Sequence, residues 1–329
     1  MKLEEFLAEW QNDSPTVLVH TSGSTGKPKP MWVEKHRMQA SARITCEFLG
    51  LHAGDTALLC LPLDYIAGKM MVVRSVTCGL RLVDIEPSGH PYWEGAVDFA
   101  AMVPLQVWNL LQDKDGRERL MQIRHLIIGG GAIDDSLATE LKSFPNAVWS
   151  TYGMTETLSH IALRRLSGPD ASDWYSPFPS VEVKVNADNC LVINAPLVHD
   201  GLLTTNDIVE LADDIVELAD GRFKVLGRKD NVICSGGVKI QIEEVERLLH
   251  QHLSQPFMIT KHPDKKFGEQ VVLLTESVDI ADVEEVCRQV LSKYWKPRFV
   301  LHVSQLPLTA TGKPARKEAE HIAEDLLNG

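Results

Sequence analysis

A strand-like run followed directly by a loop of glycine, serine, threonine and lysine constrains this chain more than any other segment. Residues 16–20, Thr-Val-Leu-Val-His, form a short run rich in β-branched and apolar residues, and residues 21–29 are, apart from Pro28, small, hydroxyl-bearing or cationic. Glycine lets a backbone approach an anion and adopt positive φ, while exposed N–H groups and hydroxyls donate hydrogen bonds to it. The segment therefore predicts a phosphate-holding loop, and a flexible linker is the alternative. The candidate phosphate ligands are Thr21, Ser22, Gly23, Ser24, Thr25, Gly26 and Lys27.

The spacing within this loop excludes the Walker A motif. That motif places four residues between its first glycine and a Gly-Lys pair, and a helix follows. Here Gly23 and Gly26 are separated by two residues, and Pro28 disfavours helical geometry at Lys27. We therefore expect a loop that closes on phosphate instead of gripping a nucleotide permanently.

The composition is that of an ordinary globular protein with a full core, and its 329 residues suffice for two domains. A net charge of −12 disfavours nucleic acid and anionic membranes as partners. The six cysteines are scattered without a C-x-x-C pair, which favours free thiols over disulfides or a zinc site. Because the N-terminus lacks a signal-peptide pattern and no 18-residue apolar run exists, we expect a cytoplasmic protein without a membrane span.

Strand-like and helical segments alternate through the first half of the chain, which predicts an α/β domain with a parallel sheet covered by helices. A helix over 34–49 is expected to end at Gly50, a favourable C-cap. The other expected helices are 1–11, 65–78, 104–111 and 134–143, and the expected strands are 16–20, 57–61, 81–85, 125–128 and 147–150.

The pattern changes in the second half. Short strands over 181–185, 190–194 and 223–226 indicate a small β subdomain of the large domain. After a polar boundary, an α+β unit follows, with helices at 242–253 and 280–293, strands at 257–260, 270–275 and 299–303, and a polar loop over 306–316 leading to a last helix. We predict a large domain over 1–228, a hinge at 229–230 and a smaller C-terminal domain over 231–329.

A tandem duplication interrupts the β subdomain. Residues 207–213, Asp-Ile-Val-Glu-Leu-Ala-Asp, recur unchanged at 214–220. A shift by an odd number of residues turns every side chain of a strand to the opposite face. One copy must therefore loop out, or the hairpin must be rebuilt, and a neutral duplication or sequence-assembly artefact is favoured over a functional device.

Four further segments follow the loop along the chain. They are Ser-Thr-Tyr-Gly-Met-Thr-Glu-Thr at 150–157, Thr-Thr-Asn-Asp at 204–207, the glycine-rich segment 227–237 and the Gly-Lys-Pro loop at 306–316. Together they resemble the acyl-adenylate-forming (AMP-binding) enzymes, which include acyl- and aryl-CoA ligases, adenylation domains and luciferases. The resemblance runs nearly end to end and implies the adenylate-forming fold, shortened at its N-terminus.

The chemistry of that family explains these residue types. A carboxylate attacks the α-phosphate of ATP, and because two anions repel, catalysis needs cations and preorganised donors. The resemblance implies that the loop holds the β- and γ-phosphates and that Glu156 binds Mg²⁺, a cation that prefers oxygen ligands. Thr155 would contact the α-phosphate, and Lys313 would bridge it to the attacking carboxylate. The resemblance also implies that the adenine lies between Tyr152 with Gly153 on one side and a wall on the other, formed by Gly129, Gly130, Gly131 and Ala132. Asp207, assisted by Arg228, would contact the ribose.

The same resemblance implies coenzyme A as second substrate. Asp230 matches the hinge about which the small domain rotates between adenylation and thioester formation. Gly236 and Gly237 match the turn beside the pantetheine tunnel, where missing side chains permit close approach. Taken singly, each residue also has a structural explanation: Tyr152 as a core aromatic, Glu156 as a carboxylate at a helix N-terminus, Arg228 as a surface charge and Lys313 as a turn lysine.

The acyl substrate is indicated by segment 61–74. Family members usually carry a subdomain before the phosphate loop, whereas about twenty residues precede it here, and such short versions resemble the o-succinylbenzoate–CoA ligases of menaquinone biosynthesis. Arg74 is the candidate for the second carboxylate of that acid, because a guanidinium suits a carboxylate bidentately, and Lys69 comes second. The alternatives are a ligase for another aromatic or medium-chain acid, a carrier-protein adenylation domain and a non-catalytic adenylate-binding module. A homodimer is compatible with the sequence.

Overall fold

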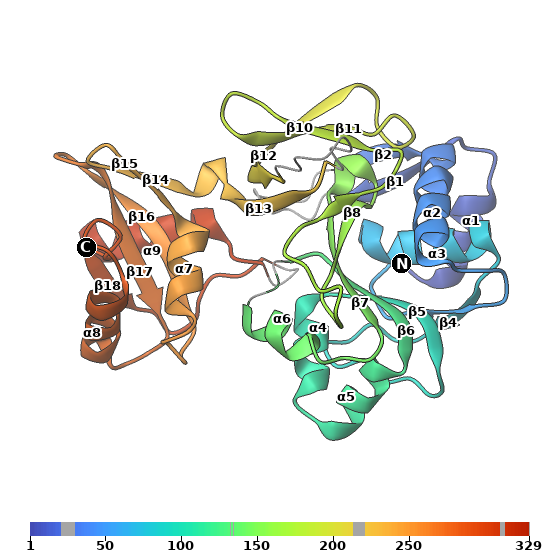
Figure 1. The fold of residues 1–329 in the computed structure, drawn as a ribbon, viewed down its shortest axis with the longest axis horizontal. Helices are drawn as coiled ribbons and strands as arrows, with labels where there is room; N and C mark the ends of the chain where they lie inside the picture. Colours follow the sequence, from blue (N-terminus) through green and yellow to red (C-terminus); the bar gives the residue numbers. More distant parts are fainter. Residues whose placement is uncertain (21–29, 132, 134, 213–220, 310–312, 329) are drawn as a thin grey trace.

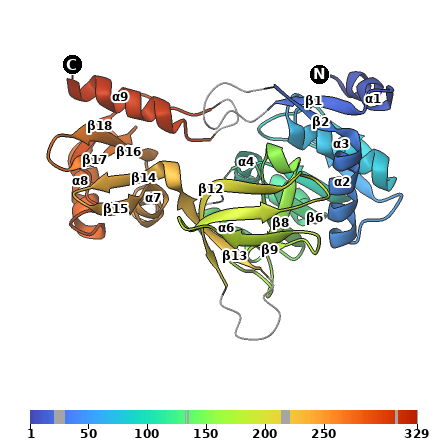
Figure 2. The same cartoon turned by 90° about the horizontal axis from the view of Figure 1, so that it is seen from above.

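The computed structural model describes residues 1–20, 30–131, 133, 135–212, 221–309 and 313–328. They form two lobes, of which the larger holds α1–α6 with β1–β13 and the smaller holds α7–α9 with β14–β18 (Figure 1). Both chain ends lie along the same side of the molecule (Figure 2). Within these described ranges, no helix is long and apolar enough to cross a membrane.

A seven-stranded sheet in the order β4-β3-β5-β6-β7-β8-β9 forms the centre of the larger lobe. Neighbours from β4 to β7 run parallel, which confirms the expected α/β arrangement, while β8 and β9 are added antiparallel. Successive strand residues face opposite sides, so Leu58 and Leu59 of β3 lie in separate apolar clusters. The strands are β3 (Thr56–Leu59), β4 (Arg81–Asp84), β5 (Val97–Met102), β6 (Ile123–Ile128), β7 (Ala147–Gly153), β8 (His160–Arg165) and β9 (Ser176–Pro177).

Helices bury both faces of this sheet, as the continuous apolar character of its strands requires. On one face, α3 contributes Met70 and Val73 to the first cluster and packs against α2. On the other, α4 and α6 contribute Leu110 and Leu141 to the second cluster. The helices are α2 (Lys35–Leu49), α3 (Ile66–Cys78), α4 (Pro104–Leu111), α5 (Lys114–Met121) and α6 (Asp135–Leu141). α2 ends at Gly50 with φ 62°, as expected.

The candidate phosphate loop connects the two strands of an antiparallel ribbon. β1 (Thr16–His20) is the expected strand and pairs with β2 (Pro30–Glu34), which the sequence analysis did not predict. α1 (Leu3–Gln11) packs beside them through Phe6 and Trp10. The loop itself, Thr21 to Lys29, lies outside the described residues.

The β subdomain is a four-stranded antiparallel sheet in the order β10-β11-β12-β13. Its strands are β10 (Glu182–Val185), β11 (Cys190–Asn194), β12 (Leu202–Leu211) and β13 (Phe223–Arg228). The first copy of the duplicated heptapeptide starts inside β12, where Asp207 pairs with Arg228 and Leu211 with Phe223. The second copy, 214–220, lies outside the described residues.

The smaller lobe has its own sheet and core. The sheet runs β15-β14-β17-β16, with β18 parallel to β17. Its apolar clusters draw on residues from Ile233 to Ala323 and share none with those of the larger lobe. This separation agrees with the predicted division at 229–230, which stays a prediction. The elements are β14 (Val232–Ser235), β15 (Val238–Gln241), α7 (Ile242–Leu249), β16 (Phe257–Asp264), β17 (Gly268–Thr275), α8 (Ile280–Val290), β18 (Phe299–His302) and α9 (Arg316–Asn328).

Candidate active site

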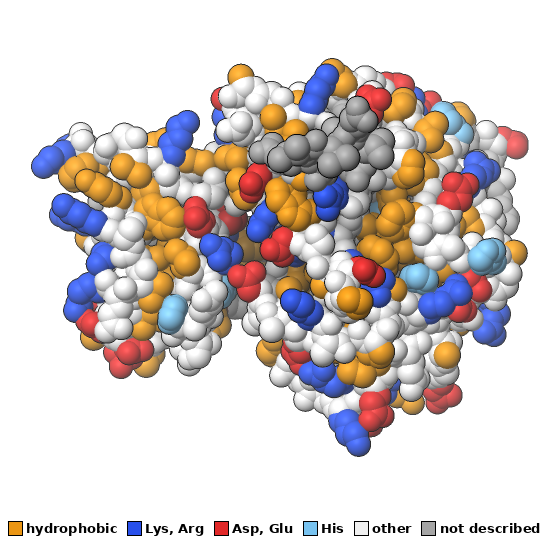
Figure 3. All heavy atoms as spheres, in the orientation of Figure 1, with side chains coloured by type: hydrophobic (Ala, Val, Ile, Leu, Met, Phe, Trp, Pro, Cys, Tyr) orange, Lys and Arg blue, Asp and Glu red, His pale blue; other side chains and the backbone are white. Residues whose placement is uncertain are grey.

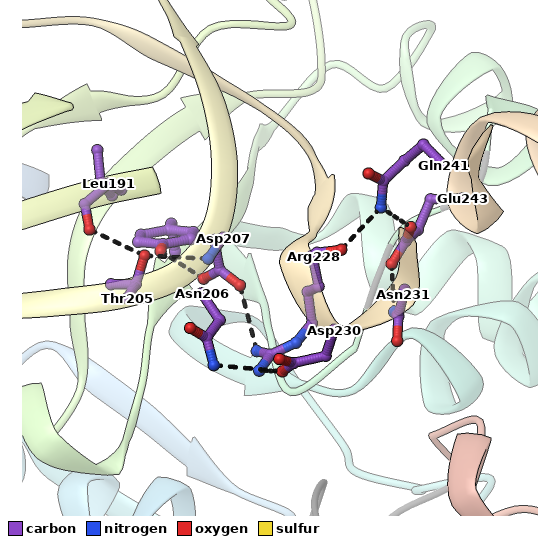
Figure 4. Close-up of polar contacts among 10 residues, drawn as sticks. Leu191, Thr205, Asn206, Asp207, Arg228, Asp230, Asn231, Gln241 and Glu243 are labelled. Atoms are coloured by element: carbon purple, nitrogen blue, oxygen red, sulfur yellow. Dashed lines mark hydrogen bonds and ion pairs between the residues drawn. The ribbon is translucent and has the colours of Figure 1, made fainter. Parts of the chain in front are cut away.

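A hydrogen-bonded cluster joins the β subdomain to the start of the smaller lobe (Figure 4). Arg228 at the end of β13 donates to Asp207 Oδ1 at 3.2 Å and to Asp230 Oδ2 at 2.9 Å. Tyr152 of β7 donates its hydroxyl to the other oxygen of Asp207 at 2.6 Å. Burial opposes the charge on Arg228, but these two carboxylates raise its pKa above the ordinary value. The candidate ribose, adenine and hinge residues therefore meet in one place.

Neighbours that the sequence analysis did not single out fix this cluster. Asn206 donates to Asp230 Oδ2 at 3.3 Å, and Gln241 donates to the carbonyl of Arg228 at 3.0 Å. A Cβ on Gly227 would lie 2.3 Å from Gln241 Nε2, so a side chain at this position would displace the amide that donates to Arg228. Asn206 belongs to the Thr-Thr-Asn-Asp motif, and its place in that motif could have indicated it as a site residue.

The Tyr152 ring is largely enclosed. It packs edge-on against Phe223 at 5.0 Å and beside Tyr175 at 5.8 Å between ring centroids, and 9% of the residue is exposed. Burial, together with the charge of Asp207, raises the pKa of its hydroxyl. Little of the ring is open for stacking in this arrangement, so its contact with adenine stays a prediction.

The segment after β7 presents a carboxylate beside a buried hydroxyl residue. Thr155 is buried and Glu156 is exposed in a single 3-10 turn, η1 (Thr155–Thr157). The chain reverses tightly here, since a Cβ on Gly153 would lie 2.3 Å from the carbonyl oxygen of Ser159. Leu158 takes φ 64°, an uncommon conformation for leucine, at the same reversal. The backbone thus holds Glu156 at the surface.

The glycine wall is described in part. A Cβ on Gly129 would lie 2.3 Å from Thr151 Oγ1, so a side chain here would displace that hydroxyl where the chain leaves β6 beside β7. Gly130 has φ 80°, and Gly131 is exposed beside Pro104. Ala132 lies outside the described residues, as do Thr21, Ser22, Gly23, Ser24, Thr25, Gly26 and Lys27.

Lys313 reaches this region from the smaller lobe. Its loop is closed by two bonds to Thr309: the Thr309 N–H donates to the Lys313 carbonyl at 2.7 Å, and the Lys313 N–H to Thr309 Oγ1 at 3.0 Å. Burial lowers the pKa of the Lys313 ammonium, and the positive charge of Arg228 lowers it further. The two cations are therefore near enough to repel, which is an arrangement suited to a polyanionic ligand. On the face in Figure 3, charged side chains of both signs line the hollow between the lobes.

The two glycines of the predicted pantetheine turn have a conformational role. Gly236 (φ 57°) and Gly237 (φ 83°) form the two-residue connection between β14 and β15. Positive φ at both positions is the requirement of a type I′ hairpin turn, so the turn itself accounts for the glycines. Their expected contact with coenzyme A remains a prediction.

Arg74 is buried in α3 without an acidic partner. Its Nη2 donates to Ser159 Oγ at 2.6 Å, its Nη1 lies 3.9 Å from the Met71 sulfur, and its Nε has no hydrogen-bond partner among the described residues. Burial lowers the pKa of this guanidinium to about 10, and no carboxylate of the described chain offsets that effect. A buried guanidinium that faces no carboxylate is costly, and its role toward a substrate carboxylate stays a prediction.

Lys69 is also buried, but it is used internally. Its Nζ donates to the Leu18 carbonyl at 2.7 Å and lies 3.8 Å from Glu9. It faces a separate cavity of about 150 Å³ that Arg74 does not line. The two candidate substrate residues are therefore not brought together, and Lys69 ties α3 to β1 and α1.

The magnesium assignment rests on a single described carboxylate. Among the residues that the structure describes, no group of three or more His, Cys, Asp or Glu side chains could hold a metal ion. Mg²⁺ bound with a nucleotide commonly uses one or two carboxylates plus phosphates and water. Exposed Glu156 fits that pattern, with the nucleotide supplying the remaining oxygens.

Proteins of known name or structure resemble this chain over most of its length. A 2-succinylbenzoate–CoA ligase of Salmonella typhimurium is 28% identical over 92% of this chain, which spans 68% of that relative's length. A solved Dyadobacter fermentans structure, described as an acyl-CoA synthetase (AMP-forming)/AMP-acid ligase II-like protein, is 33% identical. The matched region covers 97% of this chain and 92% of the Dyadobacter chain, with a TM-score of 0.64.

Two structures of Bacillus subtilis o-succinylbenzoate coenzyme A synthetase share the fold. One holds ATP and a magnesium ion (24% identity, TM-score 0.75), and the other holds the acyl-adenylate intermediate (25%, 0.76). Each covers 94% of this chain, which spans 70% and 69% of theirs. The sequence profile described as AMP-binding enzyme matches residues 3–195, more than half of the sequence. The chain therefore belongs to the AMP-binding enzyme family and has the adenylate-forming fold.

Proposed function

We propose that this protein is an ATP-dependent acid–CoA ligase that acts on o-succinylbenzoate in menaquinone biosynthesis. It joins the carboxylate to AMP with release of pyrophosphate, and then transfers the acyl group to the thiol of coenzyme A. The relatives named 2-succinylbenzoate–CoA ligase support the substrate class. Cytoplasmic location and a homodimeric state stay predictions.

The adenylation step is assigned to residues on both sides of the hollow between the lobes. Asp207 accepts from the ribose hydroxyls, Thr155 contacts the α-phosphate, and Glu156 holds Mg²⁺, which neutralises phosphate charge when bound. Lys313 then bridges the α-phosphate and the attacking carboxylate, so that both anions face one cation as the new bond forms. The position of Lys313 near Arg228, whose positive charge lowers the pKa of the Lys313 ammonium, supports this assignment because it places the lysine beside the candidate ribose residues.

Arg74 is the single observation that carries the substrate assignment. A monocarboxylic acid loses its one carboxylate to AMP and has nothing left for a buried guanidinium. A dicarboxylic acid keeps a second carboxylate, which can pair with Arg74 through charge-assisted hydrogen bonds. The unpartnered Nε and the absence of a neighbouring acid in the described chain therefore favour a dicarboxylic substrate over an aromatic or medium-chain monocarboxylic acid.

Carboxylate-dependent ATP–pyrophosphate exchange tests the proposal. We expect exchange with o-succinylbenzoate and much weaker exchange with benzoate and hexanoate at equal concentration. Equal exchange with all three acids would replace the substrate assignment by a broader acid–CoA ligase. No exchange with any acid, in protein that still binds ATP, would favour a non-catalytic adenylate-binding module.

A further inference from the structure

A chain of hydrogen bonds leads away from Arg74 into the core. Arg74 Nη2 lies 2.6 Å from Ser159 Oγ, which in turn lies 3.2 Å from His160 Nδ1. His160 Nε2 lies 3.1 Å from Thr45 Oγ1 on α2, and Thr45 donates to the Ser41 carbonyl at 3.1 Å. Arg74, His160 and Thr45 are all buried, with Thr45 fully enclosed. The chain thus joins α3, the turn after η1, β8 and α2.

The direction of every bond follows from its two ends. A guanidinium can only donate, so Ser159 Oγ accepts from Arg74. At the other end, Thr45 Oγ1 lies 3.1 Å from both the Ser41 carbonyl and His160 Nε2; we assign its single proton to the carbonyl, which can only accept, so that Thr45 Oγ1 accepts from His160 Nε2–H. A neutral imidazole with Nε2 protonated has a bare Nδ1, and Ser159 therefore donates its hydroxyl proton to Nδ1.

The charge state of His160 is consistent with this direction. Burial, followed by the positive charge of Arg74, holds the pKa of the imidazole well below its ordinary value. The ring is therefore neutral at neutral pH. The imidazole also packs against the Phe178 ring, at 5.5 Å between centroids.

This direction determines what Arg74 can do. With its proton directed at His160, Ser159 cannot donate to a ligand and serves as an acceptor for Nη2. The guanidinium is thereby held at one edge, while Nε keeps no partner among the described residues. A ligand carboxylate then meets a guanidinium with a fixed orientation and an unused donor.

We propose that His160 is a positioning residue that sets selectivity for dicarboxylic acids, by holding Ser159 as the acceptor that orients Arg74. This inference rests on the proposed function, because it assumes that Arg74 meets the second carboxylate of the substrate. His160 itself touches no substrate. It acts through Ser159, and Thr45 acts in turn through His160.

Steady-state exchange kinetics of His160→Phe and His160→Asn test the role. Phe keeps the apolar contact and removes both ring nitrogens, whereas Asn retains an acceptor near the position of Nδ1. We expect His160→Phe to raise KM for o-succinylbenzoate about tenfold, with KM for ATP and kcat changed less than about twofold. His160→Asn should recover most of that loss.

Thr45→Val and Thr45→Ser give a second, nearly isosteric pair. Valine cannot accept from Nε2–H, so we expect the ring to change to the Nδ1–H tautomer and KM for the acid to rise, whereas serine keeps both wild-type values. Ring ¹⁵N shifts, assigned by the signals lost in His160→Phe, report the tautomer directly. A packing defect alone would not change the tautomer of the His160 ring.

Three results would overturn the inference. The first is an Nδ1–H tautomer in the wild-type protein, and the second is a rise of KM for ATP in His160→Phe equal to that of KM for the acid. The third is an unchanged KM for the acid in His160→Phe although Arg74→Ala raises it. The last leaves the proposed function standing. If Arg74→Ala itself leaves KM for the acid unchanged, the substrate role of Arg74 fails, and the inference fails with it.

Discussion

Arg316 and Glu246 form a two-point ion pair that anchors the loop bearing Lys313. Both guanidinium Nη atoms lie 2.6 Å from the Glu246 carboxylate oxygens, and Nη1 also donates to the Ile259 carbonyl at 3.0 Å. Glu246 in turn accepts from the Ile259 N–H at 2.8 Å. The first residue of α9 is thereby fixed to α7 and β16, three positions after Lys313.

Breaking this pair should destabilise the smaller lobe. Both side chains are less than one-fifth exposed, so Arg316→Met leaves Glu246 enclosed and unpaired, at a cost of about 3 kcal/mol in the free energy of unfolding. Arg288→Met is the matched control, because Arg288 and Glu285 form an exposed pair on α8, for which we expect less than about 0.5 kcal/mol. Urea denaturation measures both. Equal costs would mean that Arg316 has no anchoring role.

Lys313→Ala should separate the two half-reactions. Removing the cation that bridges phosphate and carboxylate should slow pyrophosphate exchange roughly a hundredfold to a thousandfold. Thioester formation from supplied acyl-adenylate should be nearly unchanged, because the carboxylate has already been activated. Lys317→Ala removes an exposed lysine on α9 and serves as control. Equal loss in both half-reactions would contradict the assignment.

The pH dependence of adenylation should report Lys313. Burial and the neighbouring Arg228 lower its pKa, so the active cation is lost at a lower pH than for an ordinary lysine. Exchange should therefore fall as pH rises through that lowered pKa. In Lys313→Arg, a guanidinium stays charged, and the alkaline fall should disappear even if the rate is lower overall. An unchanged alkaline limb in this variant would assign the titration to another group.

Arg74→Met should lose substrate selectivity without losing stability. We expect KM for o-succinylbenzoate to rise roughly tenfold to a hundredfold while KM for ATP stays constant. Because the guanidinium is buried without an acidic partner in the described chain, replacing it by an apolar side chain should leave the free energy of unfolding unchanged or higher. Arg43→Met, on the exposed face of α2, is the control. A large loss of stability would make Arg74 a structural residue.

The sequence predicted elements whose signals are local. The strand at 16–20, the helix at 104–111 and the Gly50 terminus match the structure, because apolar period and capping chemistry act over a few residues. β5 was missed although five of its six residues are buried, since a short apolar run resembles a buried helix segment as closely as a strand. β2 was missed because its pairing with β1 is a contact across the phosphate loop.

Site residues divide in the same way. Motif positions indicated Asp207, Arg228 and Lys313, but nothing in local sequence shows that Arg228 lies between two carboxylates. The Thr45–His160 bond joins residues 115 positions apart, and a single sequence holds no signal for it. Conversely, Gly236 and Gly237 were assigned to ligand approach, whereas the hairpin turn already requires them.

The duplicated heptapeptide gives a prediction about chain connection. Residues Leu211 and Phe223 pair in the β12–β13 ladder, and the Ala212 N–H donates to the Arg222 carbonyl at 2.9 Å. Deleting 214–220 would join Asp213 directly to Gly221, whose φ is already 60°. The connection would become Asp-Gly, the preferred two-residue loop of a type I′ hairpin.

We therefore expect the deletion to keep exchange activity and to raise stability by about 1 kcal/mol, since closing a shorter loop loses less chain entropy. The melting temperature should rise by roughly 2–4 °C. Because the two copies are identical, deleting either one gives the same protein, so the choice of copy cannot affect the result. A control that replaces 214–220 by seven Gly/Ser residues keeps the loop length and should behave as the wild type. If the deletion abolishes exchange while this replacement preserves it, the length of the connection is needed for activity; if both abolish it, the second copy contributes its own side chains.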